Sequence, residues 1–162
     1  MFEHCCLNIV ICTMKLEEAI KQTKPFKSDY QKALVNLMYT HNWVNKDMKS
    51  HFKKFGITSK QYNILRILKG AQKPVSTLFV KDRLVESQSD VSRIVDRMLS
   101  KELISKQVCR NDKRLVDIEL SAKGEELLNE VQVEQDFLNK IFKNLSSNEI
   151  NQLNTLLDKI RH

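Results

Sequence analysis

The chain has 162 residues, of which 41% are hydrophobic and 29% are charged, so it is long and apolar enough to form one domain of ordinary size. This composition excludes a fully disordered chain. Only 3 glycines and 2 prolines occur, which favours uninterrupted helices over a turn-rich sandwich or barrel. The glycine-rich runs that cradle phosphates in common nucleotide-binding folds are missing from the sequence.

The net charge of +7 is distributed unevenly along the chain. Residues 1–57 hold 9 basic and 5 acidic side chains, a net charge of +4. Residues 58–121 hold 13 and 8, a net charge of +5, whereas residues 122–162 hold 5 and 7, a net charge of −2. A basic middle segment points to a polyanionic partner, although a merely lysine-rich protein would explain the charge equally well.

Four cysteines are present, three of them within the first 12 residues and the fourth at Cys109. Their spacing forms no disulfide framework, so we expect a reducing compartment, the cytoplasm. The apolar run at residues 5–12 is too short to span a membrane and lacks the basic start of a secretion signal. We expect residues 1–28 to be an extension, with residues 1–13 upstream of the true start at Met14.

The first predicted helix covers residues 29–55, where apolar residues recur at helical spacing without glycine or proline. Gly56 is expected to follow its C-terminal cap. Thr58 begins a capping box for a second helix, which is predicted to stop at Gly70. Ser76 can cap a short third helix. The predicted inward face of this third helix consists of Leu78, Phe79 and Leu84.

A fourth helix and a β-hairpin are predicted next. Residues 87–90 form another capping box, and the apolar residues behind it repeat at i, i+3, i+4, i+7 and i+8 as one stripe. These residues are Val91, Ile94, Val95, Met98 and Leu99. The period then changes, so that residues 103–110 and 115–120 are predicted to be strands joined by a polar turn at residues 111–114.

Two helices are predicted to complete the chain. Ser121 caps a fifth helix, whose apolar side reaches Ile141. Ser146 and Glu149 form a capping box that opens a sixth helix, with apolar residues as far as Ile160. The sequence therefore predicts a mainly helical protein with a small β-hairpin.

The order of three helices and a hairpin is that of a winged helix-turn-helix, in which a helix enters the major groove of DNA. The hairpin can follow the backbone or enter the minor groove. A polar helix face alone is more simply a solvated surface, but the basic hairpin tip directly after it favours DNA. The outward face of the fourth helix consists of Gln88, Ser89, Asp90, Ser92, Arg93, Asp96 and Arg97.

Residues 88–98 closely resemble the recognition helix of MarR-type transcriptional regulators. The hairpin, or wing, carries the family's Asp-x-Arg pattern at Asp112 and Arg114. Residues 120–124 match the Leu-[Ser/Thr]-x-x-Gly run at the start of the family's fifth helix. The resemblance covers residues 29–162.

The resemblance implies a homodimeric regulator, such as a repressor that a small molecule releases from a pseudo-palindrome in double-stranded DNA. Its half-sites would lie about 10 bp apart. Residues 29–57 and 122–162 would form the dimer, because the terminal helices carry more apolar positions than one small lobe covers, although these helices could also pack only on one another. Residues 58–121 would form the DNA-binding lobe, with Asp112 orienting Arg114 in the wing. The implied DNA contacts are Gln88, Ser89, Ser92, Arg93, Arg97, Asp112, Lys113 and Arg114.

Alternative functions remain open at this stage. The family also implies a small aromatic effector, although aromatic residues at helical spacing are more often core. The candidate residues for that site are Tyr39, His41, Trp43 and Tyr62. Cys109 could sense oxidants, although a structural thiol is the simpler explanation. A winged-helix module that binds a protein in place of DNA is the other alternative.

No enzymatic activity, cofactor or metal site is expected. The four histidines lack the spacing of metal ligands, and no Gly-x-Ser-x-Gly elbow or nucleophile–base set occurs.

Overall fold

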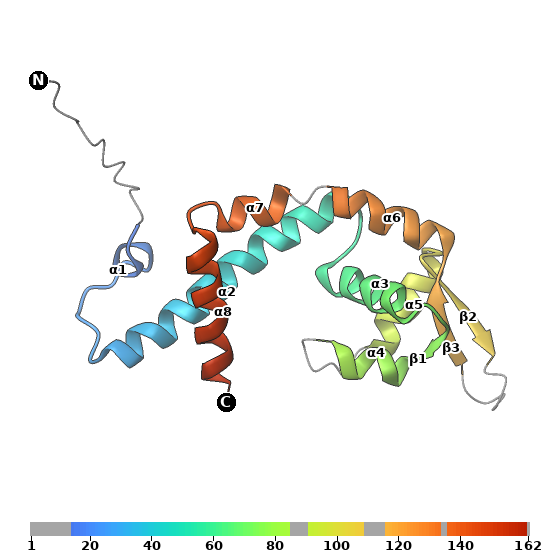
Figure 1. The fold of residues 1–162 in the computed structure, drawn as a ribbon, viewed down its shortest axis with the longest axis horizontal. Coiled ribbons are helices and arrows are strands. Elements are labelled where there is room, and N and C mark those ends of the chain that lie inside the picture. Colours follow the sequence, from blue (N-terminus) through green and yellow to red (C-terminus); the bar gives the residue numbers. More distant parts are fainter. Residues whose placement is uncertain (1–13, 85–90, 109–115, 134–135, 162) are drawn as a thin grey trace, which may run out of the picture. The chain divides into compact units, whose positions relative to one another are not determined.

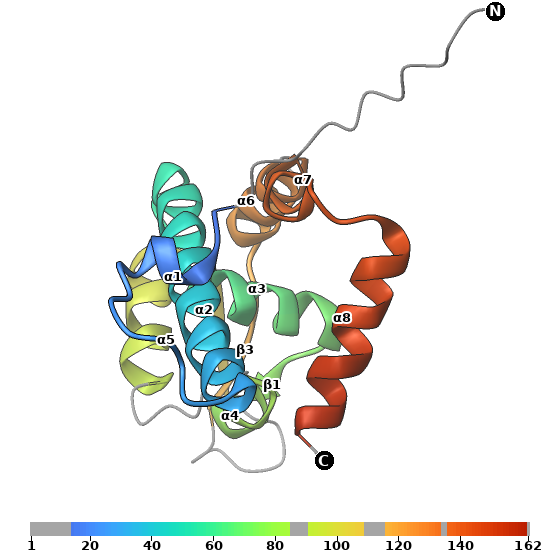
Figure 2. The ribbon, with the colours of Figure 1, turned by 90° about the vertical axis from the view of Figure 1, so that its left-hand side faces the viewer.

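The computed structural model describes residues 14–84, 91–108, 116–133 and 136–161. The chain forms two compact units, residues 1–43 and 44–162. Figure 1 shows the elements in chain order, and Figure 2 shows them from a second direction. No helix in the part of the chain that the structure describes is long and apolar enough to cross a membrane.

The first unit contains a short helix that the sequence did not predict, α1 (Leu16–Ala19), and the N-terminal part of α2 (Asp29–Lys54). Leu16 is buried, and Glu17 forms an ion pair with Lys32 of α2 at 2.6 Å. A helix of four residues is too short for helical periodicity to reveal, which is why it was not predicted.

The end of α2 follows the prediction. Gly56 adopts a left-handed φ of 67°, which glycine tolerates without a steric penalty. The N–H of Gly56 donates to the carbonyl oxygen of Lys53 at 3.1 Å, and the N–H of Ile57 donates to that of Phe52 at 3.2 Å. This is a Schellman motif, and the buried side chains of Phe52 and Ile57 provide its usual hydrophobic pair.

The second unit contains the remaining elements. They are α3 (Ser59–Ala71), β1 (Val75–Ser76), α4 (Thr77–Arg83), α5 (Val91–Ser100), β2 (Ile104–Val108), β3 (Val116–Leu120), α6 (Ala122–Val133), α7 (Asp136–Phe142) and α8 (Ser147–Ile160). Thr58 and Ser146 form the predicted capping boxes of α3 and α8, and Ser76 caps α4. The predicted capping box at residues 87–90 lies outside the described residues.

The predicted hairpin is part of a three-stranded antiparallel sheet in the order β1-β3-β2. Ile104 pairs with Leu120 between β2 and β3, and Val75 of β1 pairs with Ile118 of β3. The strand β1 was not predicted, because two residues cannot display an alternating pattern. Its partner strand lies about 40 positions further along the chain, which only the fold reveals.

Two other details of the helices differ from prediction. Of the predicted inward face, Phe79 and Leu84 are partly buried against the core, whereas Leu78 is 62% exposed. The fully buried residue of α4 is Val80, which lies two residues, and therefore about 200° around the helix, from Leu78. The helix α3 continues past Gly70 to Ala71. The predicted fifth helix corresponds to α6 and α7, and residues 134–135 between them lie outside the described residues.

The core of the second unit joins α3, α4, α5, β3 and α6. Its largest fully buried side chains are Ile64, Leu65, Val80, Met98, Ile118 and Leu128. The helix α7 adds a ring stack between Phe137 and the buried His51 of α2, with centroids 4.4 Å apart. The fold is thus mainly helical with a small antiparallel wing sheet, as predicted.

Candidate nucleic-acid interface

The helix α5 packs one face into the core and leaves the other to solvent. Its buried residues, Val91, Val95 and Met98, belong to the apolar stripe predicted from the sequence. Its exposed residues are Ser92, Arg93, Asp96, Arg97 and Ser100. Arg93 and Arg97 lie one helical turn apart, so both guanidinium groups leave the helix on the same side.

Three of the predicted DNA contacts, Ser92, Arg93 and Arg97, therefore share one exposed helix face. The other predicted contacts lie outside the described residues. These are Gln88, Ser89, Asp112, Lys113 and Arg114. Cys109, the candidate redox switch, also lies outside them.

A tight turn fixes the direction in which the chain leaves α5. The N–H of Leu103 donates to the carbonyl oxygen of Met98 at 3.0 Å, and the N–H of Glu102 donates to that of Leu99 at 2.9 Å. Glu102 has a left-handed φ of 60°, an unusual conformation for a residue with a side chain. Lys123 of α6 donates a hydrogen bond to the Glu102 carboxylate at 2.9 Å, and this bond lowers the pKa of Glu102.

Gly124 allows α6 to approach this turn closely. A Cβ atom at position 124 would overlap the carbonyl oxygen of Leu103, so no other residue fits without a backbone shift. Ser121 adds two hydrogen bonds to the same turn. Its N–H donates to the carbonyl oxygen of Leu103 at 3.3 Å, and its Oγ–H donates to the carbonyl oxygen of Glu102 at 2.6 Å. The motif that carries the family resemblance thus packs the start of α6 against the turn between α5 and β2.

The sheet side of α5 carries balanced charge. Asp96 of α5 lies 3.7 Å from the ammonium group of Lys106 on β2. On the same sheet, Glu119 of β3 accepts hydrogen bonds from Ser105 at 3.1 Å and from Gln107. The pair between Asp96 and Lys106 links α5 to β2, whereas the other two contacts join β3 to β2.

The opposite side of α5 borders a groove of about 870 Å³, lined by the C-terminal turn of α2, the start of α3 and α5. Six basic side chains line this groove, which we call the basic groove. They are Lys49, Lys53, Lys60, Arg93, Arg97 and Lys101. Sequence reasoning found only the two arginines, since the lysines of α2 and α3 lie more than 30 positions earlier in the chain.

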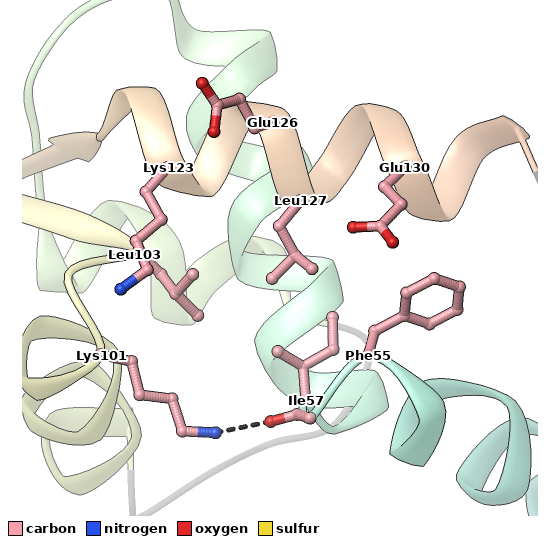
Figure 3. A pocket seen from close by; sticks show the side chains of 9 residues that line it. Phe55, Ile57, Lys101, Leu103, Lys123, Glu126, Leu127 and Glu130 are labelled. Atoms are coloured by element: carbon pink, nitrogen blue, oxygen red, sulfur yellow. Dashed lines mark hydrogen bonds between the residues drawn. The ribbon is translucent and has the colours of Figure 1, made fainter.

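A smaller pocket of about 470 Å³ lies between the α2–α3 turn and α6 (Figure 3). Phe55, Ile57, Leu103 and Leu127 provide its apolar walls. Lys101 extends along its edge and donates from Nζ to the carbonyl oxygen of Gly56 at 2.5 Å. Among the residues that the structure describes, no three His, Cys, Asp or Glu side chains are grouped so that they could hold a metal ion.

The four candidate effector residues fall in different units. Tyr39, His41 and Trp43 belong to the first unit, where Tyr39 is 39% and Trp43 is 45% exposed, so neither ring is in the core of that unit. Tyr62 belongs to the second unit and is half-buried, with its ring centroid 4.7 Å from that of Phe52. For Tyr62, packing in the core is therefore the observed role.

Comparisons with known proteins agree with this geometry. The family model "Transcriptional regulator SarA/Rot" matches residues 46–131. The HTH-type transcriptional regulator MgrA of Staphylococcus aureus is 32% identical over 111 residues, which is 68% of this chain and 74% of that protein.

Solved structures of two transcriptional regulators have a similar fold. A mutant MarR from E. coli, complexed with operator DNA, has a TM-score of 0.74 at 22% identity, with 85% of this chain and 99% of that chain covered. The organohalide-sensing regulator RdhR-CbdbA1625, in its 2,4-dichlorophenol-bound form, has a TM-score of 0.76 at 20% identity, with 86% of each chain covered.

The chain has a winged helix-turn-helix fold like that of MarR. The chain belongs to the SarA/Rot family of transcriptional regulators. It is thus a DNA-binding transcriptional regulator and not an enzyme, as predicted from the sequence.

Proposed function

We propose that the protein is a homodimeric repressor that binds a pseudo-palindromic operator and leaves it when a small phenolic molecule binds. The observation that carries the DNA-binding part is the exposed face of α5, where Ser92, Arg93 and Arg97 lie together beside the basic groove. Arginine can pair with guanine edges in the major groove, and serine can bond base edges or phosphates. The related MarR of E. coli has been solved with operator DNA.

The proposed DNA-reading residues extend beyond the described part of the chain. Gln88 and Ser89 would reach bases ahead of Arg93. In the wing, Asp112 would orient Arg114 toward the minor groove, with Lys113 beside it. Residues 58–121 would then form the DNA-binding lobe.

Gel-shift titration tests the role of the α5 arginines. With a duplex from the promoter of the protein's own gene, we expect Arg93→Ala or Arg97→Ala to cost about 1–3 kcal/mol of binding free energy, because each bidentate base contact contributes about that amount. Lys24→Ala is the control for the loss of one positive charge, since Lys24 is exposed and lies outside the proposed DNA-binding lobe and dimer regions. If both α5 variants bind as tightly as this control, the proposed interface is wrong and a protein-binding module becomes the better explanation.

Exposed apolar side chains support the dimer. In the first unit, α2 exposes Tyr30, Leu34, Leu37, Met38 and Trp43. In the second unit, α7, α8 and the loop between them expose Leu138, Phe142, Leu145, Leu156 and Ile160. Apolar surface of this extent is typical of an interface between copies of one chain. We therefore propose that residues 29–57 and 122–162 form the dimer.

The effector part of the proposal rests on the exposed rings of Tyr39 and Trp43 and on the relative solved with 2,4-dichlorophenol. Tyr39, His41 and Trp43 would line the effector site. Trp43 is the sole tryptophan, so its fluorescence reports directly on this site. Titration with 2,4-dichlorophenol should quench that fluorescence and release the operator duplex over the same concentration range.

Tyr39→Ala should shift both curves to higher concentration, because the substitution removes an aromatic ring from the site. Phe26→Ala is the control, since it also removes an aromatic ring but lies outside the proposed effector and dimer residues. Quenching without release of DNA, or equal shifts in the two variants, would contradict the proposed site while leaving the DNA-binding role intact.

A further inference from the structure

The basic groove has a one-sided charge that the base-reading role of α5 does not explain. Among the described residues that line it, six are basic and none is aspartate or glutamate. Lys49 and Lys53 come from α2, Lys60 from α3, and Lys101 from the residue after α5. Clustered like charges repel one another and favour a bound polyanion that neutralises them.

The contact that Lys101 makes leaves its charge in place. Lys101 donates to the neutral carbonyl oxygen of Gly56, a bond that positions the ammonium group without cancelling its charge. By contrast, the sheet side of α5 is balanced by the pair between Asp96 and Lys106. The positive field is therefore concentrated on the side of α5 that faces the start of α3.

The cations are arranged in rows. Lys49 and Lys53 lie one turn apart on α2, and Arg93, Arg97 and Lys101 follow one another at intervals of four residues. The N–H of Lys101 donates to the Arg97 carbonyl oxygen at 3.3 Å, which continues the helical spacing past the end of α5. Four helical residues span about 6 Å, so each row presents charge at a regular interval along a line.

This arrangement suits an extended polyanion better than a small one. A site for a small molecule encloses most of its ligand, whereas Lys49, Lys53, Arg93, Arg97 and Lys101 are all exposed to solvent. The major groove of B-DNA is about 12 Å wide and has a phosphate backbone on each side. A helix in that groove has one backbone on each flank.

We propose that the basic groove binds the phosphate backbone on the α3 side of the major groove, with Lys49, Lys53 and Lys101 as phosphate contacts. The wing would then lie toward the other backbone. This inference rests on the proposed insertion of α5 into DNA and adds a second set of contacts to it. Because phosphates are alike in every sequence, these lysines contribute affinity and register, while α5 contributes sequence preference.

The salt dependence of binding tests the proposal. The full chain and Lys49→Gln/Lys53→Gln are titrated between about 50 and 200 mM salt against the promoter duplex and a scrambled duplex of equal length. The slope of log K against log salt should become shallower by about 0.9 for each phosphate that the variant no longer neutralises. The phosphates of both half-sites are counted. Affinity for both duplexes should fall by the same factor, on the order of 10 to 100, so that their ratio is unchanged.

Lys24→Gln/Lys27→Gln is the matched control, because it removes the same charge from two exposed lysines that lie outside both the proposed DNA-binding lobe and the proposed dimer regions. If the groove variant keeps the slope of this control while the wild type binds DNA, the phosphate contacts are refuted and the proposed function stands. If the wild type binds neither duplex, the proposed function itself fails. If pyrophosphate raises the Tm of the wild type but not of the groove variant, and the slopes are equal, the groove binds a small anion and the proposal is overturned.

Discussion

At the residue scale, Gly124 shows how one position can connect a sequence motif to the geometry of the interface. The motif could be recognised in the sequence, but its physical cause could not, because the clash involves the carbonyl oxygen of Leu103, 21 positions earlier in the chain. The absence of a side chain lets the start of α6 pack against the turn that leads into β2. The orientation of the wing relative to α5 therefore depends on this glycine.

Gly124→Ala should destabilise the protein by about 1–3 kcal/mol, since an inserted methyl group must displace backbone. Urea denaturation of the wild type and the variant measures the difference in the free energy of unfolding. Gly70→Ala is the control, because a Cβ atom at this helical position meets nothing within 4 Å. Alanine should be neutral or stabilising there by up to about 1 kcal/mol. Equal effects of the two substitutions would show that the α6–turn contact is not tight.

At the scale of the element, helix ends were predicted better than any other feature. The capping residues Thr58, Ser76 and Ser146 and the terminating Gly56 all have the predicted roles, because a cap depends only on residues within one turn of it. The wing sheet was predicted incompletely, since β1 owes its strand conformation to pairing with β3 and not to its own pattern.

The candidate site was also predicted only in part, because residues close together in the sequence could be recognised and residues far apart in the sequence could not. The polar face of α5 could be derived from its own periodicity, which the buried Val91, Val95 and Met98 confirm. The lysines of the basic groove could not, because α2, α3 and α5 meet only in the folded lobe. The basic excess of residues 1–57 and 58–121 was the sequence signal of their presence.

The cap of α8 predicts a pH dependence of stability. The Ser146 N–H donates to the Glu149 carboxylate at 2.8 Å and the Ser146 hydroxyl donates at 2.7 Å, and these bonds lower the pKa of Glu149 below its usual 4.5. A carboxyl whose pKa is lowered on folding stabilises the fold above its unfolded pKa, and that contribution disappears as the pH falls through its folded pKa.

Glu149→Gln should therefore lower the Tm near neutral pH, and the difference from the wild type should shrink steadily below pH 4.5. Thermal unfolding followed by circular dichroism across this range provides the measurement. Glu126→Gln, at an exposed carboxylate of α6, corrects for the loss of one negative charge. A difference that grows toward acid pH would mean that the charged cap does not stabilise α8.

At the scale of the whole molecule, the exposed apolar stripe of α8 supports the proposed dimer. No residue of α8 is buried, although its sequence carries a regular apolar stripe. Leu156 is 59% exposed and Ile160 is 69% exposed. Burying a leucine side chain contributes about 1.5–3 kcal/mol to the free energy of folding. The exposed side chains of this stripe do not make that contribution. A second copy of the chain would cover this stripe and also place two α5 helices on one pseudo-palindrome.

Leu156→Glu should therefore convert the dimer to a monomer, because association would bury an unpaired carboxylate against apolar surface. Sedimentation equilibrium measures the mass directly. Leu78→Glu is a closely matched control, since Leu78 of α4 is the same residue type, is 62% exposed and lies outside the terminal helices. The control should remain dimeric. The Leu156 variant should also bind the promoter duplex more weakly, since each monomer grips only one half-site. A Leu156→Glu protein that remains dimeric would place the interface elsewhere and leave the apolar stripe of α8 without its proposed partner.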